Sequence, residues 1–217
     1  MCSSDLHAIT VDLADSDSVA KMASWSLETI GAPDLILVTV VEYASTFADL
    51  DDMKVDDWKR AFEINFFGYI RVLENLLPAM RERGSGSIVL TASMVALIPD
   101  PSAAILLRYM AIKHALLGLS QALAIALEGS GVKSICFCPS LTATANSVSS
   151  FQESKFAGLP VLISGAAKAE DVAKLFVANL DNDEFLICAH PSYRELLVDL
   201  ANHSLDPKKY ILKHQGL

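Results

Sequence analysis

Tyr109-Met110-Ala111-Ile112-Lys113 is the most informative segment of this 217-residue chain. On a helix, residues four apart share one face, so the phenol and the ammonium can point into the same site. A nearby cation favours the phenolate and lowers a tyrosine pKa from about 10, which suits the residue to general acid or base work. The chain has five tyrosines, so this spacing alone is a modest coincidence, and a surface tyrosine beside a solvated lysine is the competing interpretation.

Two further polar residues stand where such chemistry would need them. Ser93 follows the run 87–92, which comes after Gly84-Ser85-Gly86 and predicts a buried strand. A hydroxyl at the carboxyl end of a parallel strand faces the crevice where open α/β sheets bind ligands. Asn65 lies inside the helical stretch 58–69, where a buried amide needs hydrogen-bond partners. Taken singly, Ser93 is more often a strand terminator and Asn65 a satisfied core amide.

The order of these four residues resembles a known family. Asn65, Ser93, Tyr109 and Lys113 are similar to the catalytic tetrad of the short-chain dehydrogenase/reductase family. The surrounding segments resemble it too, namely Asp57-Trp58, Gly86-Ser87-Ile88-Val89 and Pro139-Ser140-Leu141-Thr142-Ala143-Thr144. The last of these is similar to the family's Pro-Gly-x-x-x-Thr loop, with Ser140 in place of the glycine. The resemblance extends from about Ala8 to at least Ile187.

The resemblance implies an NAD- or NADP-dependent oxidoreductase acting on CH–OH groups, with a small secondary alcohol or ketone as substrate. Tyr109 would be the general acid/base, and Lys113 would lower the Tyr109 pKa and hold the nicotinamide ribose. Ser93 would donate a hydrogen bond to the substrate oxygen and so stabilise developing charge. Asn65 would position a water that links Lys113 to solvent.

The same resemblance implies a set of cofactor-binding residues. Besides Tyr109 and Lys113, the set contains Asp12, Leu13, Pro139 and Thr144. The Asp12 carboxylate would meet the adenine edge, and the Thr144 hydroxyl the carboxamide side of the nicotinamide. Without the tetrad, a turn residue at a strand end would be an equally good interpretation of Asp12.

The chain also departs from the family. It has no Gly-x-x-x-Gly-x-Gly turn to hold the cofactor pyrophosphate, a place where glycines and a helix N-terminus normally approach the phosphates. Residues 1–6 have no counterpart and match the translation of a common sequencing adapter, so we expect a non-native leader on a fragment that is inactive by itself. The family's Asn-Asn-Ala-Gly is replaced by Val38-Thr39-Val40-Val41-Glu42-Tyr43, where β-branched residues resist the backbone shapes that glycine permits. The alternative function is therefore a non-catalytic binding or scaffolding protein of the same fold.

Strand and helix patterns alternate along the chain. We expect strands at 8–13, 35–41, 87–92, 133–138 and 184–189, and helices at 16–30, 55–82, 102–128, near 168–180, and from the 190–193 segment to about residue 203. This order predicts an α/β fold: a doubly wound parallel sheet, Rossmann-like and three-layered (α/β/α), lacking the first βαβ portion. Residues 1–217 would form a single incomplete domain, with 144–165 as a substrate lid and 190–217 as a C-terminal helix and tail.

Composition narrows the class of partner. Hydrophobic residues make up 52% of the chain and the mean hydropathy is +0.37. The apolar runs are much shorter than a membrane span, so we expect buried strands, no membrane insertion and a cytoplasmic protein. A net charge of -9 and a pI near 4.9 argue against nucleic-acid binding. The four cysteines lack zinc-site spacing, so we expect buried free thiols and no metal.

The apolar content of two helices predicts association. Helix 102–128 carries apolar residues beyond a single stripe: Ile105, Leu106, Leu107, Leu116, Leu117, Leu119, Leu123 and Ile125. In the family, helices in the positions of 55–82 and 102–128 pair with their copies in a second subunit. We therefore expect a homodimer or homotetramer; the alternative is that the excess packs inside the monomer, under residues 144–165.

Overall fold

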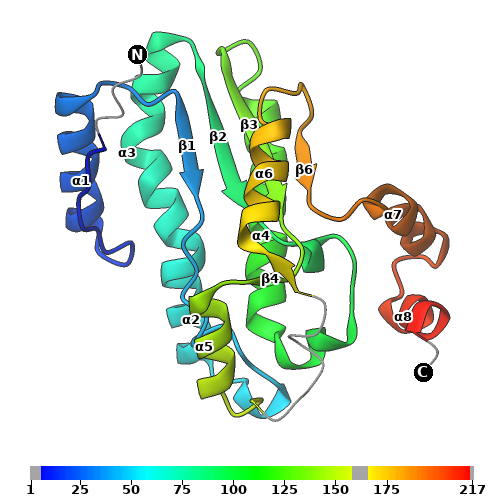
Figure 1. Ribbon diagram of the computed structural model, residues 1–217. Coiled ribbons are helices and arrows are strands. Elements are labelled where there is room, and N and C mark those ends of the chain that lie inside the picture. The colour runs from blue at the N-terminus through cyan, green and yellow to red at the C-terminus, as the bar shows by residue number, and fades with distance from the viewer. Residues whose placement is uncertain (1–5, 158–165, 216–217) are drawn as a thin grey trace.

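The computed structural model describes residues 6–157 and 166–215 (Figure 1). Four parallel strands form the main sheet in the order β1-β2-β3-β6. These strands are β1 (Leu35–Val38), β2 (Gly86–Thr91), β3 (Val132–Cys138) and β6 (Leu186–Cys188). The expected leader lies outside the described residues except for Leu6, and the last part of the expected lid, 158–165, also lies outside them.

Helices cover both faces of the sheet, which confirms the three-layer α/β prediction (Figure 1). On one face lie α1 (Ser16–Thr29), α3 (Gly68–Arg83) and α4 (Leu107–Ala126), whose inner side chains share a core with Ile88 and Leu90. On the other face lies α6 (Ala169–Asn179). Successive residues of a strand point to opposite faces, and burying each large apolar side chain stabilises the fold by roughly 1.5–3 kcal/mol.

The second face is thinner than the first. Val172 and Phe176 of α6 pack on Val89, Ile135 and Phe137 from the sheet, and the ring centroids of Phe137 and Phe176 lie 4.9 Å apart. α6 does not extend over the outer part of β1, where Leu37 stays 40% exposed. β1 is the edge strand at one end of the described sheet, and one of its faces is poorly covered.

The predicted strand at 8–13 is wrong, because the described residues give this segment no neighbouring strand with which to share a ladder. Side chains of two helices hold it instead. The Asp12 N–H donates to Ser18 Oγ at 2.9 Å, and Arg71 Nη1 donates to the Leu13 carbonyl at 3.0 Å. The apolar alternation seen in the sequence serves to bury Leu13 against α3.

The long predicted helices are both interrupted. The helix expected at 55–82 consists of α2 (Val55–Phe62), a π-helical turn at Glu63–Phe67 and then α3. The one expected at 102–128 begins with a 3₁₀ turn at Pro101–Ile105 before α4. Pro101 and the side chain of Asp100, which accepts from the Ser102 N–H at 2.7 Å, start this turn.

Short elements complete the fold. β4 (Thr142–Ala143) pairs in parallel with β5 (Ala167–Lys168) as a separate two-stranded sheet. α5 (Ala145–Glu153) follows β4, α7 (Tyr193–Asn202) follows β6, and α8 (Pro207–Gln215) comes last. The remaining 3₁₀ turns lie at Leu50–Asp52 and Met94–Ala96.

α4 is, among the described residues, the helix whose length and apolar composition would also suit a membrane span. It carries the buried side chains of Arg108 and Lys113, and its residues Ile112 and Leu116 are buried in the core on the sheet. This packing accounts for the apolar inner face of α4 as part of the fold.

Candidate active site

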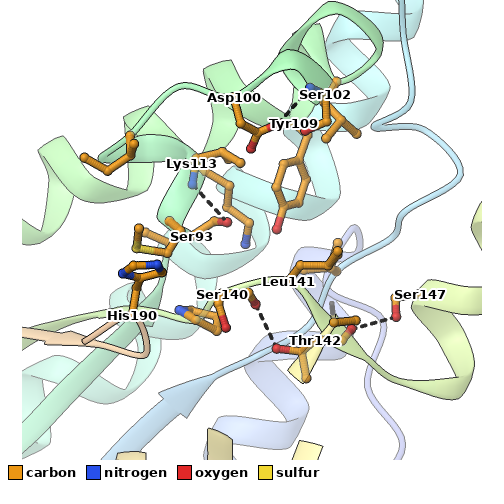
Figure 2. A pocket seen from close by; sticks show the side chains of 18 of the residues that line it. Ser93, Asp100, Ser102, Tyr109, Lys113, Ser140, Leu141, Thr142, Ser147 and His190 are labelled. Atoms are coloured by element: carbon orange, nitrogen blue, oxygen red, sulfur yellow. Dashed lines mark hydrogen bonds between the residues drawn. The ribbon is translucent and has the colours of Figure 1, made fainter. Parts of the chain in front are cut away.

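A cavity of about 700 Å³ opens at the carboxyl ends of the parallel strands. The segments that follow β1, β2, β3 and β6 all contribute to it, together with α4, α5 and the C-terminal helices. Figure 2 shows Tyr109 and Lys113 on one side of this cavity, with Ser140, Leu141 and Thr142 facing them. This is the edge of an open α/β sheet at which ligands bind.

Tyr109 lies in the first turn of α4, and its ring lines the cavity. Burial raises the pKa of the Tyr109 phenol, and the neighbouring Tyr43 raises that pKa further. A hydrogen bond with the Ser93 side chain lowers the pKa, but by less than burial raises it. The phenol is therefore protonated at neutral pH, the state in which it can donate a proton.

Lys113 lies one turn further along α4, and its side chain is only 1% exposed. Its Nζ donates to the Thr91 carbonyl at 2.8 Å and lies 5.4 Å from the centroid of the Tyr109 ring. Burial lowers the pKa of this lysine to about 8. Burial is the largest influence on the Tyr109 pKa and raises it, so the lowering of that pKa by Lys113 stays a prediction.

Ser93 ends the β2 segment, as the sequence predicts, and is 7% exposed. It caps the 3₁₀ turn Met94–Ala96, and its Oγ accepts from the Val95 N–H at 3.4 Å. Its hydroxyl is thus held at the cavity by backbone geometry and remains beside the Tyr109 phenol.

Asn65 sits in the π-helical turn and is 2% exposed, but it is not among the residues that line the cavity. Its Nδ2 donates to the Ala61 carbonyl at 3.0 Å and to the Glu42 carbonyl at 3.3 Å. Its Oδ1 accepts from the Glu42 N–H at 2.9 Å. The amide therefore clamps the segment that follows β1, and its predicted role in positioning a water stays a prediction.

The predicted cofactor-binding residues fall into two groups. Pro139 and Thr144 line the same cavity as Tyr109 and Lys113. Thr144 also caps α5, accepting from the Ser147 N–H at 3.1 Å. By contrast, Asp12 and Leu13 lie with α1 and α3, away from the cavity-lining residues: Asp12 is exposed, and Leu13 is a core residue.

Tyr43 is a site residue to which sequence reasoning assigned no role. Its ring stacks on Tyr109, with centroids 6.1 Å apart and planes inclined by 20°. The turn that carries it is anchored by Asn65 at Glu42 and by Arg108, whose Nη1 donates to the Ser45 carbonyl at 2.6 Å. The available signal was its position just beyond the end of a parallel strand, the same argument that selected Ser93.

The thiols behind the site are free, as predicted for the two buried ones. Cys136 and Cys138 point to one face of β3 with their sulfurs 3.8 Å apart. Both belong to the core that α4 covers. Among the described residues, no group of three or more His, Cys, Asp or Glu side chains is arranged to hold a metal ion.

Comparison with known proteins gives a consistent pattern. Residues 1–155 match the family model described as short chain dehydrogenase. A 1-deoxy-11-beta-hydroxypentalenate dehydrogenase from Streptomyces exfoliatus is 28% identical over 193 residues, covering 88% of this chain and 67% of that protein. Dehydrogenase/reductase SDR family member 4 from Bos taurus is 34% identical over 125 residues, covering 58% and 43% respectively.

Solved structures agree on the fold. A short chain dehydrogenase/reductase from Burkholderia phymatum, crystallised with NAD, superposes with a TM-score of 0.75 at 21% identity. The match covers 95% of this chain and 78% of that one.

The chain spans between about two fifths and two thirds of the length of the curated relatives it matches first.

Proposed function

Because the chain belongs to the short-chain dehydrogenase family, we propose that its cavity is the active site of an NAD- or NADP-dependent oxidoreductase. The reaction would transfer a hydride between the nicotinamide and a secondary alcohol or ketone. One observation carries the proposal: a phenol, a serine hydroxyl and a buried ammonium converge on one cavity from α4 and the end of β2.

In the direction of ketone reduction, Tyr109 donates its proton to the substrate oxygen. The raised pKa of its phenol keeps the proton in place until charge develops on that oxygen. The Ser93 hydroxyl donates a hydrogen bond to the same oxygen and stabilises the developing alkoxide. In the oxidation direction Tyr109 acts as the base, and the Lys113 ammonium favours the phenolate it must then form.

The described residues fit one end of the cofactor better than the other. Tyr109, Thr144 and Lys113 supply hydroxyl and ammonium groups beside the reacting centre, where a nicotinamide and its ribose would be held, and Pro139 lines the same cavity. When bound, the nicotinamide supplies or accepts the hydride. Among the described residues that line the cavity there is no glycine that could approach a pyrophosphate; Gly84, Gly86, Gly129 and Gly131 serve turns at the amino ends of β2 and β3.

The rival function is that of a non-catalytic binding or scaffolding protein. The segment after β1 is the feature that supports it. There Val41 and Tyr43 line the cavity at the place of the family's Asn-Asn-Ala-Gly. The enzymatic proposal includes a small-molecule substrate and a cytoplasmic location. It includes no nucleic-acid or membrane partner.

A turnover assay separates the two functions. The protein restored with the family's glycine-rich N-terminal turn is incubated with millimolar NADH or NADPH and a panel of ketones, and consumption of the reduced nicotinamide is followed by absorbance. Ketone-dependent consumption supports the oxidoreductase. If NADH or NADPH binds but is not consumed under any of these conditions, the result would favour the non-catalytic scaffolding function.

A further inference from the structure

The cavity is apolar over most of its wall, and that wall is assembled from distant parts of the chain. Ile98 and Leu106 come from the segment between β2 and α4, Val148 and Phe151 from α5, and Leu196 and Tyr210 from α7 and α8. The C-terminal helices are fixed there because Tyr210 and Leu200 share a small core with Ile98, in which the three side chains are 4%, 7% and 8% exposed.

Four of the described residues lining the cavity can carry charge, namely Asp100, Lys113, His190 and His214. Asp100 accepts from the Ser102 N–H, Lys113 donates to the Thr91 carbonyl, and His214 Nε2 lies 2.6 Å from an Asp199 carboxylate oxygen. No arginine is found among the described residues that line the cavity.

The fourth group is His190, which follows β6 (Figure 2). Its Nδ1 accepts from the Ser192 N–H at 3.2 Å, so in the neutral ring the proton sits on Nε2. A neutral imidazole N–H can donate to a ketone or hydroxyl oxygen, but it brings no charge to neutralise an anion.

These features decide what the cavity can accept. An apolar body gains by leaving water, whereas a carboxylate or phosphate on the apolar wall, away from the Lys113 ammonium beside Tyr109, would be buried without a cationic partner and is strongly disfavoured. Ser93 and Tyr109 offer the two hydroxyl groups that would meet the oxygen of the reacting carbon. We propose that this site takes a bulky, uncharged, apolar secondary alcohol or ketone and discriminates against substrates that carry a carboxylate or phosphate. The inference rests on the proposed function for the identity of the reacting group.

Binding can be measured without turnover. A bicyclic decalone and the same ring system bearing a carboxylate are titrated into the chain by calorimetry. The decalone should bind at least ten times more tightly than its carboxylate. Equal binding, tighter binding of the carboxylate, or binding of neither compound overturns the inference.

A charge-introducing variant tests the cause. Leu141 lines the cavity and is 47% exposed, so an arginine can be accommodated there (Figure 2). Leu141→Arg should tighten binding of the carboxylate at least tenfold. Val177→Arg is the matched control, because Val177 is 67% exposed on α6 and does not line the cavity; it should leave both affinities unchanged. An unchanged carboxylate affinity in Leu141→Arg would contradict the inference.

The two proposals fail in different ways. Tight decalone binding with no consumption of reduced nicotinamide would remove the oxidoreductase and keep the apolar site. Efficient turnover of small hydroxy acids would keep the oxidoreductase and remove the apolar specificity.

Discussion

At the scale of single residues, Lys113 contributes an unusual pH dependence. Burial lowers its pKa from 10.5 to about 8, so between these values the unfolded chain binds the extra proton and the folded chain does not. The free energy of unfolding therefore rises with pH across this window, and the unfavourable burial of the ammonium is fully present below about pH 8. The difference corresponds to roughly 3 kcal/mol.

We predict that Lys113→Met abolishes this gain in stability between pH 8 and 10.5 and raises the free energy of unfolding at pH 7 by about 1–3 kcal/mol. Urea unfolding at several pH values measures it. Lys133→Met is the control, because that side chain is 59% exposed on the surface and should change little. A pH profile of Lys113→Met that matches the parent would contradict the burial argument.

Residue identities predicted part of the site. Tyr109, Lys113 and Ser93 line one cavity. Their proximity could be predicted from the helical spacing of the first two and from the position of the serine after a strand. Tyr43 was missed because nothing in the local sequence says that the turn carrying it is clamped by Asn65, 22 residues later in the chain. The direction of the Tyr109 pKa was also missed, because it depends on burial that only the packed structure defines.

At the scale of elements, Asn65 links the π-helical turn to the segment after β1. Replacing it with leucine leaves the Glu42 N–H without its acceptor inside the fold. We predict that Asn65→Leu lowers the free energy of unfolding by about 1–3 kcal/mol, as measured by urea denaturation.

Asn75→Leu provides the comparison for that experiment. Asn75 Nδ2 donates only to the Arg71 carbonyl one turn earlier in the same helix, at 2.8 Å, so its loss should cost less than about 1 kcal/mol. Equal losses in the two variants would mean that the clamp on Glu42 contributes nothing of its own.

Helix and strand periodicity located most elements but could not supply their neighbours. The runs that became β2 and β3 are apolar enough to be buried on both faces, and the structure pairs them in register. The 8–13 segment instead alternates apolar and polar residues from Ile9 to Leu13, and it finds no partner strand among the described residues. The π-helical turn was not predictable either, because one extra residue in a helix leaves almost no mark on a periodic pattern.

At the scale of the whole molecule, dinucleotide affinity tests the fit of the cofactor. The described residues offer groups for the nicotinamide end and no glycine turn for the pyrophosphate in the cavity lining. We predict that this 217-residue chain binds NAD and NADP with affinities weaker than micromolar, measured by calorimetry. Micromolar binding would show that other residues hold the phosphates.

Association is the second whole-molecule prediction. Part of the apolar excess of the α4 segment is used inside the monomer, since Leu116 is buried and Leu106 lines the cavity. Ile125 at the end of α4 and Phe67 in the π-helical turn remain 79% and 46% exposed. We predict that the protein forms a two-fold homodimer, or a tetramer built from two such dimers. Sedimentation velocity measures this assembly. A monomer persisting at high micromolar concentration would rule this out.

The central claim is that Tyr109 transfers the proton, and the substitution Tyr109→Phe tests it most directly. The variant keeps the ring stacked on Tyr43 and removes only the hydroxyl. Tyr193→Phe, outside the cavity lining, is the control. In the restored protein, with millimolar cofactor and the best ketone, we predict that Tyr109→Phe lowers kcat by about 10²–10⁴-fold while cofactor affinity stays nearly intact. A variant that retains most of the parent's kcat would contradict the account.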